Sequence, residues 1–253
     1  MIIYIIIIII TFITTYIFIK NNTSCIIKKY IKNIENERNV AMNGLDIEYY
    51  INFSFHYRLF NLFELVSKKL DEKGINYFII CGGLIGYFRH NQGFIPWDDD
   101  IDIGVMEEDR SKLHDAINEL KKDYKYINLG IHDIDKVLYG KFNENAIQID
   151  IFYFKYFPDK NYYFYNVEKH RKMWKNEYFN KDEIFPLQKV PFKLYAPDGT
   201  IYKEIQVSIP NKSINYLDRA YKNWSSKMIP TNTHSDYYNL IFPYSRHIKN
   251  LFN

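Results

Sequence analysis

The spacing of apolar residues predicts a series of helices and strands from about residue 52 onward. In the segment 57–73, Phe60, Phe63, Val66 and Leu70 recur at helical spacing, and Gly74 follows as a stop signal. Residues 76–81 form a short apolar run before a Gly-Gly pair, which predicts a buried strand, a tight turn and a short helix over 84–90. A second strand is expected where Ile101, Ile103 and Val105 alternate with polar residues or glycine.

The rest of the chain mixes helical and strand patterns without strict alternation. We expect helices over 107–122, 163–179 and 213–224, strands over 126–131, 136–142 and 146–154, and a hairpin over 192–207. This mixture predicts an α+β fold with a central mixed sheet.

The N-terminal segment differs from everything that follows it. Residues 1–19 are almost entirely apolar, and a bilayer core needs roughly 20 such residues in a helix, so the segment predicts a single transmembrane anchor. A cleaved signal peptide is the alternative, although the segment has no basic start and no clear cleavage site. Residues 20–51 are polar and predict a stalk, which leaves 52–253 as the folded domain.

The flanking charges leave the orientation of such an anchor open. Lys20, Lys28 and Lys29 follow the apolar segment, and the positive-inside tendency would place them in the cytosol. The alternative is the opposite orientation, with the domain in the lumen of the Golgi, the ER or another endomembrane.

Composition excludes one class of partner. The 253 residues carry a net charge of +3 and no long basic block, which argues against nucleic-acid binding.

Cys25 and Cys81 are too few for a disulfide framework, and the histidines lack the spacing of zinc ligands.

Two carboxylates on the second predicted strand carry the strongest chemical signal. Period-two geometry sends Asp100 and Asp102 to the same face, while the isoleucines between and beside them turn to the other. Side-by-side carboxylates repel each other unless a cation lies between them, and their oxygen atoms suit Mg²⁺ or Mn²⁺.

Asp150 follows the same logic on a later predicted strand. Ile149 and Ile151 flank it, so its carboxylate leaves the strand on the side opposite the isoleucines. If the two strands are neighbours, three carboxylates converge on one metal site.

A phosphate site is expected just upstream of this strand. Gly82 and Gly83 lie at a predicted strand-to-helix turn, where glycine permits close backbone approach and the helix N-terminus attracts phosphate. Arg89 supplies a further candidate phosphate donor.

Two ordinary explanations compete for the acidic run 98–102. A solvated loop is the usual setting of three successive aspartates, but here the run leads directly into alternating isoleucines. An EF-hand loop would require glycine where Ile103 stands and a helix where Pro96 stands, so it is rejected.

These residues resemble the signature of the LicD/fukutin family. The resemblance rests on residues 81–90 (CGGLIGYFRH), 93–103 (GFIPWDDDIDI) and 149–152 (IDIF), with weaker similarity at 185–187, 209–210 and 216–217. It implies a polymerase-β-like nucleotidyltransferase fold and a transferase that moves phosphocholine, ribitol phosphate or a similar group from a CDP-linked donor to a glycan hydroxyl.

The resemblance also implies roles for individual residues. Asp100, Asp102 and Asp150 would hold the metal and supply the catalytic carboxylates, Gly82 and Gly83 would bind donor phosphate, and Arg89 would assist them. Trp97 would stack on donor or acceptor, unless it only anchors its loop.

Two departures from the family pattern put the acceptor in doubt rather than the reaction class. Tyr221 is followed by Lys222 instead of glycine, and the cysteine-rich insertion of some fukutin-related members is missing. A nucleotidyltransferase with an NTP donor and an inactive membrane-anchored scaffold stay open as alternatives.

Overall fold

The computed structural model describes residues 53–96, 98–140, 147–196 and 198–226. The expected anchor (1–19), the stalk (20–51) and Trp97 lie outside these ranges. Within the described residues, no helix combines the length and apolar character needed to cross a membrane.

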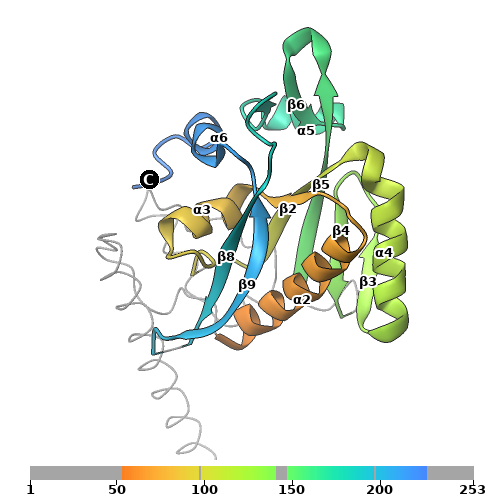
Figure 1. Ribbon diagram of the computed structural model, residues 1–253, viewed down its shortest axis with the longest axis vertical. Coiled ribbons are helices and arrows are strands. Elements are labelled where there is room, and N and C mark those ends of the chain that lie inside the picture. Colours follow the sequence, from red (N-terminus) through yellow and green to blue (C-terminus); the bar gives the residue numbers. More distant parts are fainter. Residues whose placement is uncertain (1–52, 97, 141–146, 197, 227–253) are drawn as a thin grey trace, which may run out of the picture.

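A seven-stranded mixed sheet forms the centre of the molecule (Figure 1). Five strands run in the spatial order β1 (Tyr77–Ile79), β2 (Asp100–Met106), β5 (Ile147–Phe157), β4 (Asp135–Tyr139) and β3 (Ile127–Gly130). The far end of β5 also pairs with β6 (Tyr162–Tyr165), which pairs with β7 (Phe179–Asn180). Only the β2–β5 pairing among these strands is parallel, so the expected central mixed sheet is confirmed.

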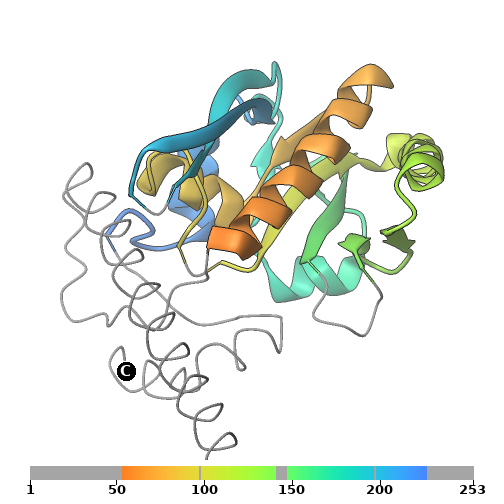
Figure 2. The same cartoon turned by 90° about the horizontal axis from the view of Figure 1, so that it is seen from below.

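Helices cover both faces of this sheet. Helix α2 (Phe53–Glu72) lies across β2 and β5 beside α4 (Arg110–Asp123), which follows a short 3-10 helix at Glu107–Asp109. The short helix α5 (Glu168–Met173) lies on the opposite side of the sheet from α2 (Figure 2). One face of β2 and β5 therefore packs against α2, and part of the other face packs against α5.

Helix α2 forms where the helical spacing predicted it, beginning four residues earlier. Its buried stripe includes Leu59, Phe60, Phe63, Val66 and Leu70, all fully buried. Burying each such side chain contributes about 2 kcal/mol to folding, so this stripe fixes the helix against the sheet.

A separate two-stranded hairpin packs against α2. It consists of β8 (Gln188–Tyr195) and β9 (Ile201–Ile209), paired antiparallel as the sequence predicted. Phe192 of β8 stacks on Phe60 at 6.3 Å between ring centroids and meets Phe94 edge-on at 5.1 Å. The hairpin therefore packs against both α2 and the loop that leads into β2.

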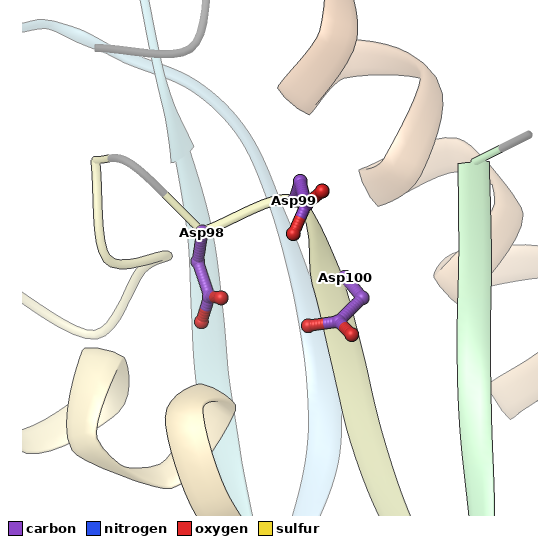
Figure 3. Close-up of side chains that lie close together, drawn as sticks. All are labelled: Asp98, Asp99 and Asp100. Carbon is purple, nitrogen blue, oxygen red and sulfur yellow. The ribbon is translucent and has the colours of Figure 1, made fainter. Parts of the chain in front are cut away.

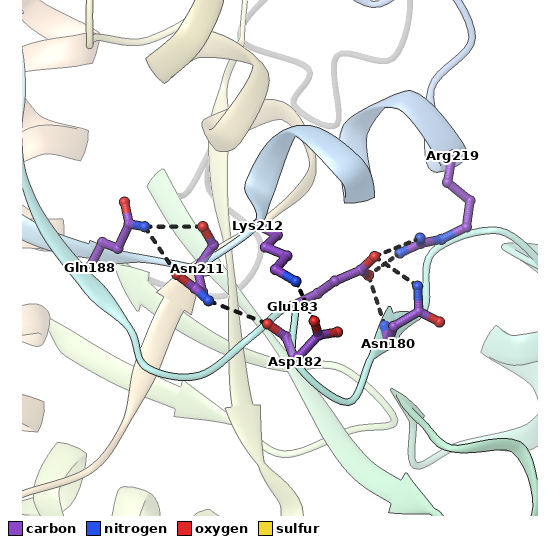
Figure 4. Close-up of polar contacts among 7 residues, drawn as sticks. All are labelled: Asn180, Asp182, Glu183, Gln188, Asn211, Lys212 and Arg219. Carbon is purple, nitrogen blue, oxygen red and sulfur yellow. Dashed lines mark hydrogen bonds and ion pairs between the residues drawn. The ribbon is translucent and has the colours of Figure 1, made fainter.

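Polar contacts attach the last described helix, α6 (Ser213–Ala220), to the segment between β7 and β8 (Figure 4). The buried carboxylate of Glu183 accepts hydrogen bonds from Arg219 and from the backbone and side chain of Asn180, at 2.6–3.1 Å. Asp182 pairs with Lys212 at the start of the helix.

Several predicted elements differ from the structure, and the last predicted helix, 213–224, already ends at Ala220. The helix expected over 163–179 was wrong at both ends, because Tyr162–Tyr165 form β6 and Phe179 begins β7, leaving only Glu168–Met173 helical. These aromatic residues pair with the end of β5, and local spacing does not reveal that long-range pairing. The helix expected over 84–90 begins earlier, and α3 runs from Cys81 to Arg89.

Candidate functional site

Three carboxylates meet at one end of the central strands. In the parallel pairing of β2 with β5, Asp102 lies opposite Asp150, and Asp100 lies two residues before Asp102 on the same face. One oxygen from each of the three side chains lies within 4.8 Å of the others. The structure thus brings together Asp100, Asp102 and Asp150, and we call them the carboxylate cluster.

A lysine that sequence reasoning missed completes this row. Lys136 of β4 lies opposite Asp150 in the antiparallel pairing of β4 with β5. Its Nζ donates to the two oxygens of Asp150 at 3.0 and 2.8 Å. Asp102, Asp150 and Lys136 therefore lie side by side across three strands, an arrangement that only the strand register reveals.

A second set of acidic residues, which shares Asp100 with the carboxylate cluster, begins just before it in the sequence. Asp98, Asp99 and Asp100 also bring carboxylate oxygens within 4.8 Å of one another, where the loop leads into β2 (Figure 3). Asp99 and Asp100 are buried, and Asp98 is partly buried. This burial contradicts the expectation for a plain solvated loop.

His56 of α2 contacts this loop and fixes its position. Burial lowers the pKa of His56 to about 4, against smaller raising effects of the Asp98 carbonyl and the Asp99 charge, so the ring is neutral at pH 7. Its Nε2–H donates to the Asp98 carbonyl at 3.0 Å, and the ring stacks on Phe94 at 4.9 Å. His56 lies just before the helix predicted over 57–73, and a single histidine there gave no sequence signal for this role.

The two glycines at the start of α3 have different surroundings. The chain turns at Cys81, whose φ is 50°, so Gly82 and Gly83 form the first turn of the helix instead of a loop before it. A Cβ on Gly82 would lie 2.5 Å from Oδ2 of Asp98, whereas one on Gly83 would lie 2.7 Å from Cγ2 of Ile79. Gly82 therefore borders the acidic loop, and Gly83 packs against the core.

Arg89 lies at the other end of α3 and is buried. Its Nη1 donates to the carbonyl of Trp224 at 2.7 Å, and its Nε donates to Nε2 of His90 at 2.9 Å. Burial lowers the pKa of Arg89 to about 10, while the charge of Asp98 acts in the opposite direction, so the guanidinium stays charged at pH 7. These contacts fix Arg89 within the protein, and a direct role in phosphate binding stays a prediction.

A cluster of buried polar side chains contacts Cys81, the first residue of α3. The carboxylate of Glu177 accepts hydrogen bonds from Tyr165 and, at 2.8 Å, from Tyr221, and the Cys81 thiol lies 3.9 Å away. Burial and the nearby charges of Glu177 and Asp102 raise the pKa of the Cys81 thiol well above its usual value. Cys81 is therefore a neutral packing residue, since only the thiolate is a good nucleophile or metal ligand.

The donor set of the carboxylate cluster fits a hard divalent cation. All three groups offer oxygen, and a cation at 2.0–2.6 Å from each ligand spans oxygen pairs up to about 5 Å apart. The N-terminus of α3, with its partial positive charge, begins beside Asp98 of the preceding loop. The site therefore combines possible cation ligands with a helix end suited to phosphate.

The central part of the chain matches the model of a known family. Residues 74–196 match the family model described as "LicD/FKTN/FKRP, nucleotidyltransferase domain". This range includes α3, the carboxylate cluster and Lys136, and ends just after β8.

Individual relatives are similar at modest identity. An uncharacterised protein of Rickettsia typhi is 29% identical over 184 residues, covering 73% of this chain and 51% of that protein. The mouse ribitol-5-phosphate transferase FKTN is 23% identical, covering 70% of this chain and 37% of that protein. The lipopolysaccharide cholinephosphotransferase LicD of Haemophilus influenzae is 23% identical, covering 67% and 74%.

The chain spans about half the length of the first curated relatives it matches, at 51% and 59%. Among solved structures, terminal uridylyl transferase 4 of Trypanosoma brucei aligns over 50% of this chain and 37% of that chain, with 10% identity and a TM-score of 0.27. A likeness at that level carries no argument about this protein.

Proposed function

Because residues 74–196 match the nucleotidyltransferase-domain model of the LicD/FKTN/FKRP family, we propose that the protein is a metal-dependent phospho-alcohol transferase. It would move phosphocholine, ribitol phosphate or a similar group from a CDP-linked donor to a glycan hydroxyl. The names of two relatives, a ribitol-5-phosphate transferase and a cholinephosphotransferase, support this reaction class. The observation that carries the proposal is the alignment of Asp102 with Asp150 beside Asp100.

Asp100, Asp102 and Asp150 would hold Mg²⁺ or Mn²⁺. When bound, the ion would supply positive charge against the donor diphosphate and the departing CMP. The cluster contains no sulfur or imidazole ligand, and this oxygen-only set supports a hard cation over zinc.

The donor phosphates would lie at the N-terminus of α3. The first backbone N–H groups of a helix point outward without intrahelical partners, and Gly82 has no side chain to cover them. Gly83, which faces Ile79 and Ile101, would act by allowing the helix to pack closely on β2. Arg89 would act at longer range through its charge.

The transfer itself needs one proton acceptor. The acceptor hydroxyl oxygen would form a bond to the donor phosphorus, the bond from phosphorus to the CMP oxygen would break, and the hydroxyl proton would pass to a carboxylate of the cluster. Asp100, Asp102 and Asp150 are the candidates for this proton acceptor. The products are a phosphodiester and CMP.

We also propose that residues 1–19 anchor the protein in an endomembrane with the domain on the lumenal side. The apolar composition of that segment supports the anchor. A protease-protection assay on vesicles that contain the intact chain would test this topology.

Donor binding provides the direct test of the reaction class. The thermal stability of the intact chain would be followed with CDP-choline, CDP-ribitol, CDP-glycerol, CTP and UTP, each with Mg²⁺, with Mn²⁺ and with EDTA. Metal-dependent stabilisation by a CDP-alcohol, absent from Asp102→Asn, is the expected result. Stabilisation by an NTP alone would indicate a nucleotidyltransferase, and no response to any metal or donor would indicate a scaffold.

A further inference from the structure

The ammonium group of Lys136 already occupies one of the carboxylates that would hold a metal ion. Its Nζ donates to the two oxygens of Asp150 at 3.0 and 2.8 Å. Asp150 is buried and Lys136 is partly buried, so little solvent screens this pair. One of the same oxygens belongs to the group of ligand atoms that Asp150 forms with Asp100 and Asp102. A cation in the carboxylate cluster and the ammonium group would therefore share one carboxylate.

Two cations on one carboxylate repel each other. A divalent ion lies about 2.0–2.6 Å from a ligating oxygen, so it would come within about 6 Å of an ammonium nitrogen held at 2.8 and 3.0 Å from the oxygens of the same carboxylate. Charges at that distance interact strongly where solvent is partly excluded. The three carboxylates attract the ion and the lysine repels it, so the net affinity depends on whether Lys136 stays beside Asp150.

Lys136 has space to leave Asp150 without any movement of the backbone. It pairs with Gly130 of β3 on one side and with Asp150 of β5 on the other, so the sheet holds the main chain of β4 in place. Its side chain also lines a cavity of about 500 Å³. The exposed residues Asp133 and Lys169 belong to the same lining, so the cavity is open to water. Rotation of the Lys136 side chain would move its ammonium group from the cluster into this hydrated space.

A second explanation of the contact predicts the opposite effect on the metal. Carboxylates that ligate a metal are commonly held by a hydrogen bond from an outer residue, and loss of that residue lowers metal affinity by about 10–100-fold. If Lys136 only orients Asp150, its removal weakens metal binding. If it neutralises Asp150 in place of the metal, its removal strengthens metal binding. The full positive charge of Lys136 and its contact with both oxygens favour neutralisation.

We propose that Lys136 is the counter-ion of the metal-free site, and that a divalent cation displaces its ammonium group from Asp150. The proposal rests on the metal site of the function proposed above and adds a residue that regulates its affinity. Without metal, the lysine keeps a buried carboxylate neutralised. With metal, the loss of that ion pair opposes binding, which keeps the affinity for free metal low.

Titration of Mn²⁺ into the intact chain without donor, followed by the EPR signal of free Mn²⁺, measures this affinity. The variants are Lys136→Met, which removes the charge and keeps the length of the side chain, and Lys136→Arg, which keeps the charge. Lys169→Met is the matched control, because Lys169 lines the same cavity from α5. Asp102→Asn shows whether the carboxylate cluster holds the ion.

We expect Lys136→Met to bind Mn²⁺ about tenfold more tightly than the wild type, because one repelling charge is removed. Lys136→Arg should bind no more tightly than the wild type, and Lys169→Met should stay within about twofold of it, since its charge is exposed and screened. Asp102→Asn should lose most of the affinity. Unchanged or weaker binding in Lys136→Met would overturn the proposal, and weaker binding would assign Lys136 an orienting role.

Chemical labelling of the wild type tests the displacement without any substitution. Acetylation of lysines by acetic anhydride would be quantified by mass spectrometry with and without saturating Mg²⁺. Acetylation of Lys136 relative to Lys169 should rise several-fold with Mg²⁺, because the amine leaves its carboxylate partner for the hydrated cavity. An unchanged ratio at saturating Mg²⁺ would overturn the proposal.

The Mn²⁺ and donor titrations together separate this result from the fate of the transferase proposal. If Asp102→Asn loses Mn²⁺ binding and Lys136→Met does not strengthen it, the metal site stands and only the role of Lys136 is wrong. If Lys136 behaves as expected and no CDP-alcohol binds, the counter-ion stands and the reaction class fails. If the wild type binds no Mn²⁺, the metal site fails and this proposal fails with it.

Discussion

Asp102 of β2 lies directly opposite Asp150 of β5 in the parallel pairing of the two strands. Backbone hydrogen bonds of the central sheet therefore set the spacing of these two carboxylates. Lys136 lies opposite Asp150 on the next strand, so the row continues from two acidic residues to a basic one. Side chains in a fixed register need little rearrangement to bind a cation, which is the physical basis of the predictions below.

Asp102→Asn should abolish transfer without harming the fold. We expect kcat/KM to fall by about 100-fold or more, since even residues that only support metal ligands cost 10–100-fold. Stability in EDTA should be unchanged or slightly higher, because one of several like charges is removed. The exposed residue Asp115 of α4 offers the control Asp115→Asn, which should retain activity. Near-normal turnover in Asp102→Asn would refute the metal assignment.

Lys136→Met should cost more stability without metal than with it. The lysine and Asp150 are 28% and 10% exposed, so the loss of this partly buried pair should lower the unfolding free energy by about 1–2 kcal/mol in EDTA. A bound cation would take over part of the neutralisation and reduce that loss. Urea denaturation with EDTA and with Mn²⁺ measures both values, with Lys121→Met on the exposed face of α4 as control. An equal loss in the two conditions would separate Lys136 from the metal site.

Alanine substitutions should distinguish the two glycines at the start of α3. A Cβ at position 83 would lie 2.7 Å from Ile79 and 3.1 Å from Ile101 in the core, so Gly83→Ala should lower stability by about 1–3 kcal/mol. At position 82 the close neighbour is the end of the Asp98 side chain, which can rotate away. Gly82→Ala should therefore stay within about 0.5 kcal/mol of the wild type while weakening CDP-alcohol binding. Equal losses of stability in the two variants would contradict this separation.

The ionised carboxylate of Asp135 should stabilise the folded state, and this contribution should be lost at low pH. Burial by itself raises the pKa of Asp135, but hydrogen bonds from His114, Tyr153, the His132 backbone and Arg110 outweigh it and hold the pKa below the ordinary value of 3.8. A depressed native pKa adds stability above the unfolded pKa, and that stability is lost as pH falls through the native pKa.

Asp135→Asn should therefore lower the unfolding free energy by about 3 kcal/mol at pH 7, with a deficit that shrinks below about pH 4. Urea denaturation from pH 7 to pH 3 measures the profile, with the exposed Asp133→Asn as control. A deficit that does not change with pH would show that the carboxylate charge is not the cause.

Glu177 should have the opposite pH dependence. Burial raises the pKa of Glu177 above 4.5, although hydrogen bonds from Tyr165, Tyr221 and Cys81 oppose the shift. A raised native pKa gives stability that is complete below the unfolded pKa and is lost as pH rises through the native pKa.

Glu177→Gln removes this titration, so its stability relative to the wild type should increase with pH from about 4.5 and then level off above the native pKa. Denaturation between pH 4 and pH 8 checks this, and Glu204→Gln on the exposed side of β9 should show no such trend. A relative stability that falls with rising pH would contradict the shift.

The alternation at Asp100–Met106 determined by itself that two aspartates share a face opposite Ile101 and Ile103. Such alternation is a local property of an extended chain, which is why the strand and its acidic face were predictable. The hairpin β8–β9 and the helix α2 were predictable for the same reason, since each depends on spacing within a few residues.

Only the tertiary structure decided which distant residues meet. The partnership of Asp102, Asp150 and Lys136 depends on the strand order β2–β5–β4 and its register, and a shift of one residue would turn Asp150 to the other face. The same holds for β6, whose aromatic residues became a strand because the end of β5 was available to pair with them. The sequence therefore determined which chemical groups each strand presents. Long-range pairing decided which of these groups meet, because the register between strands is set by packing across the whole sheet.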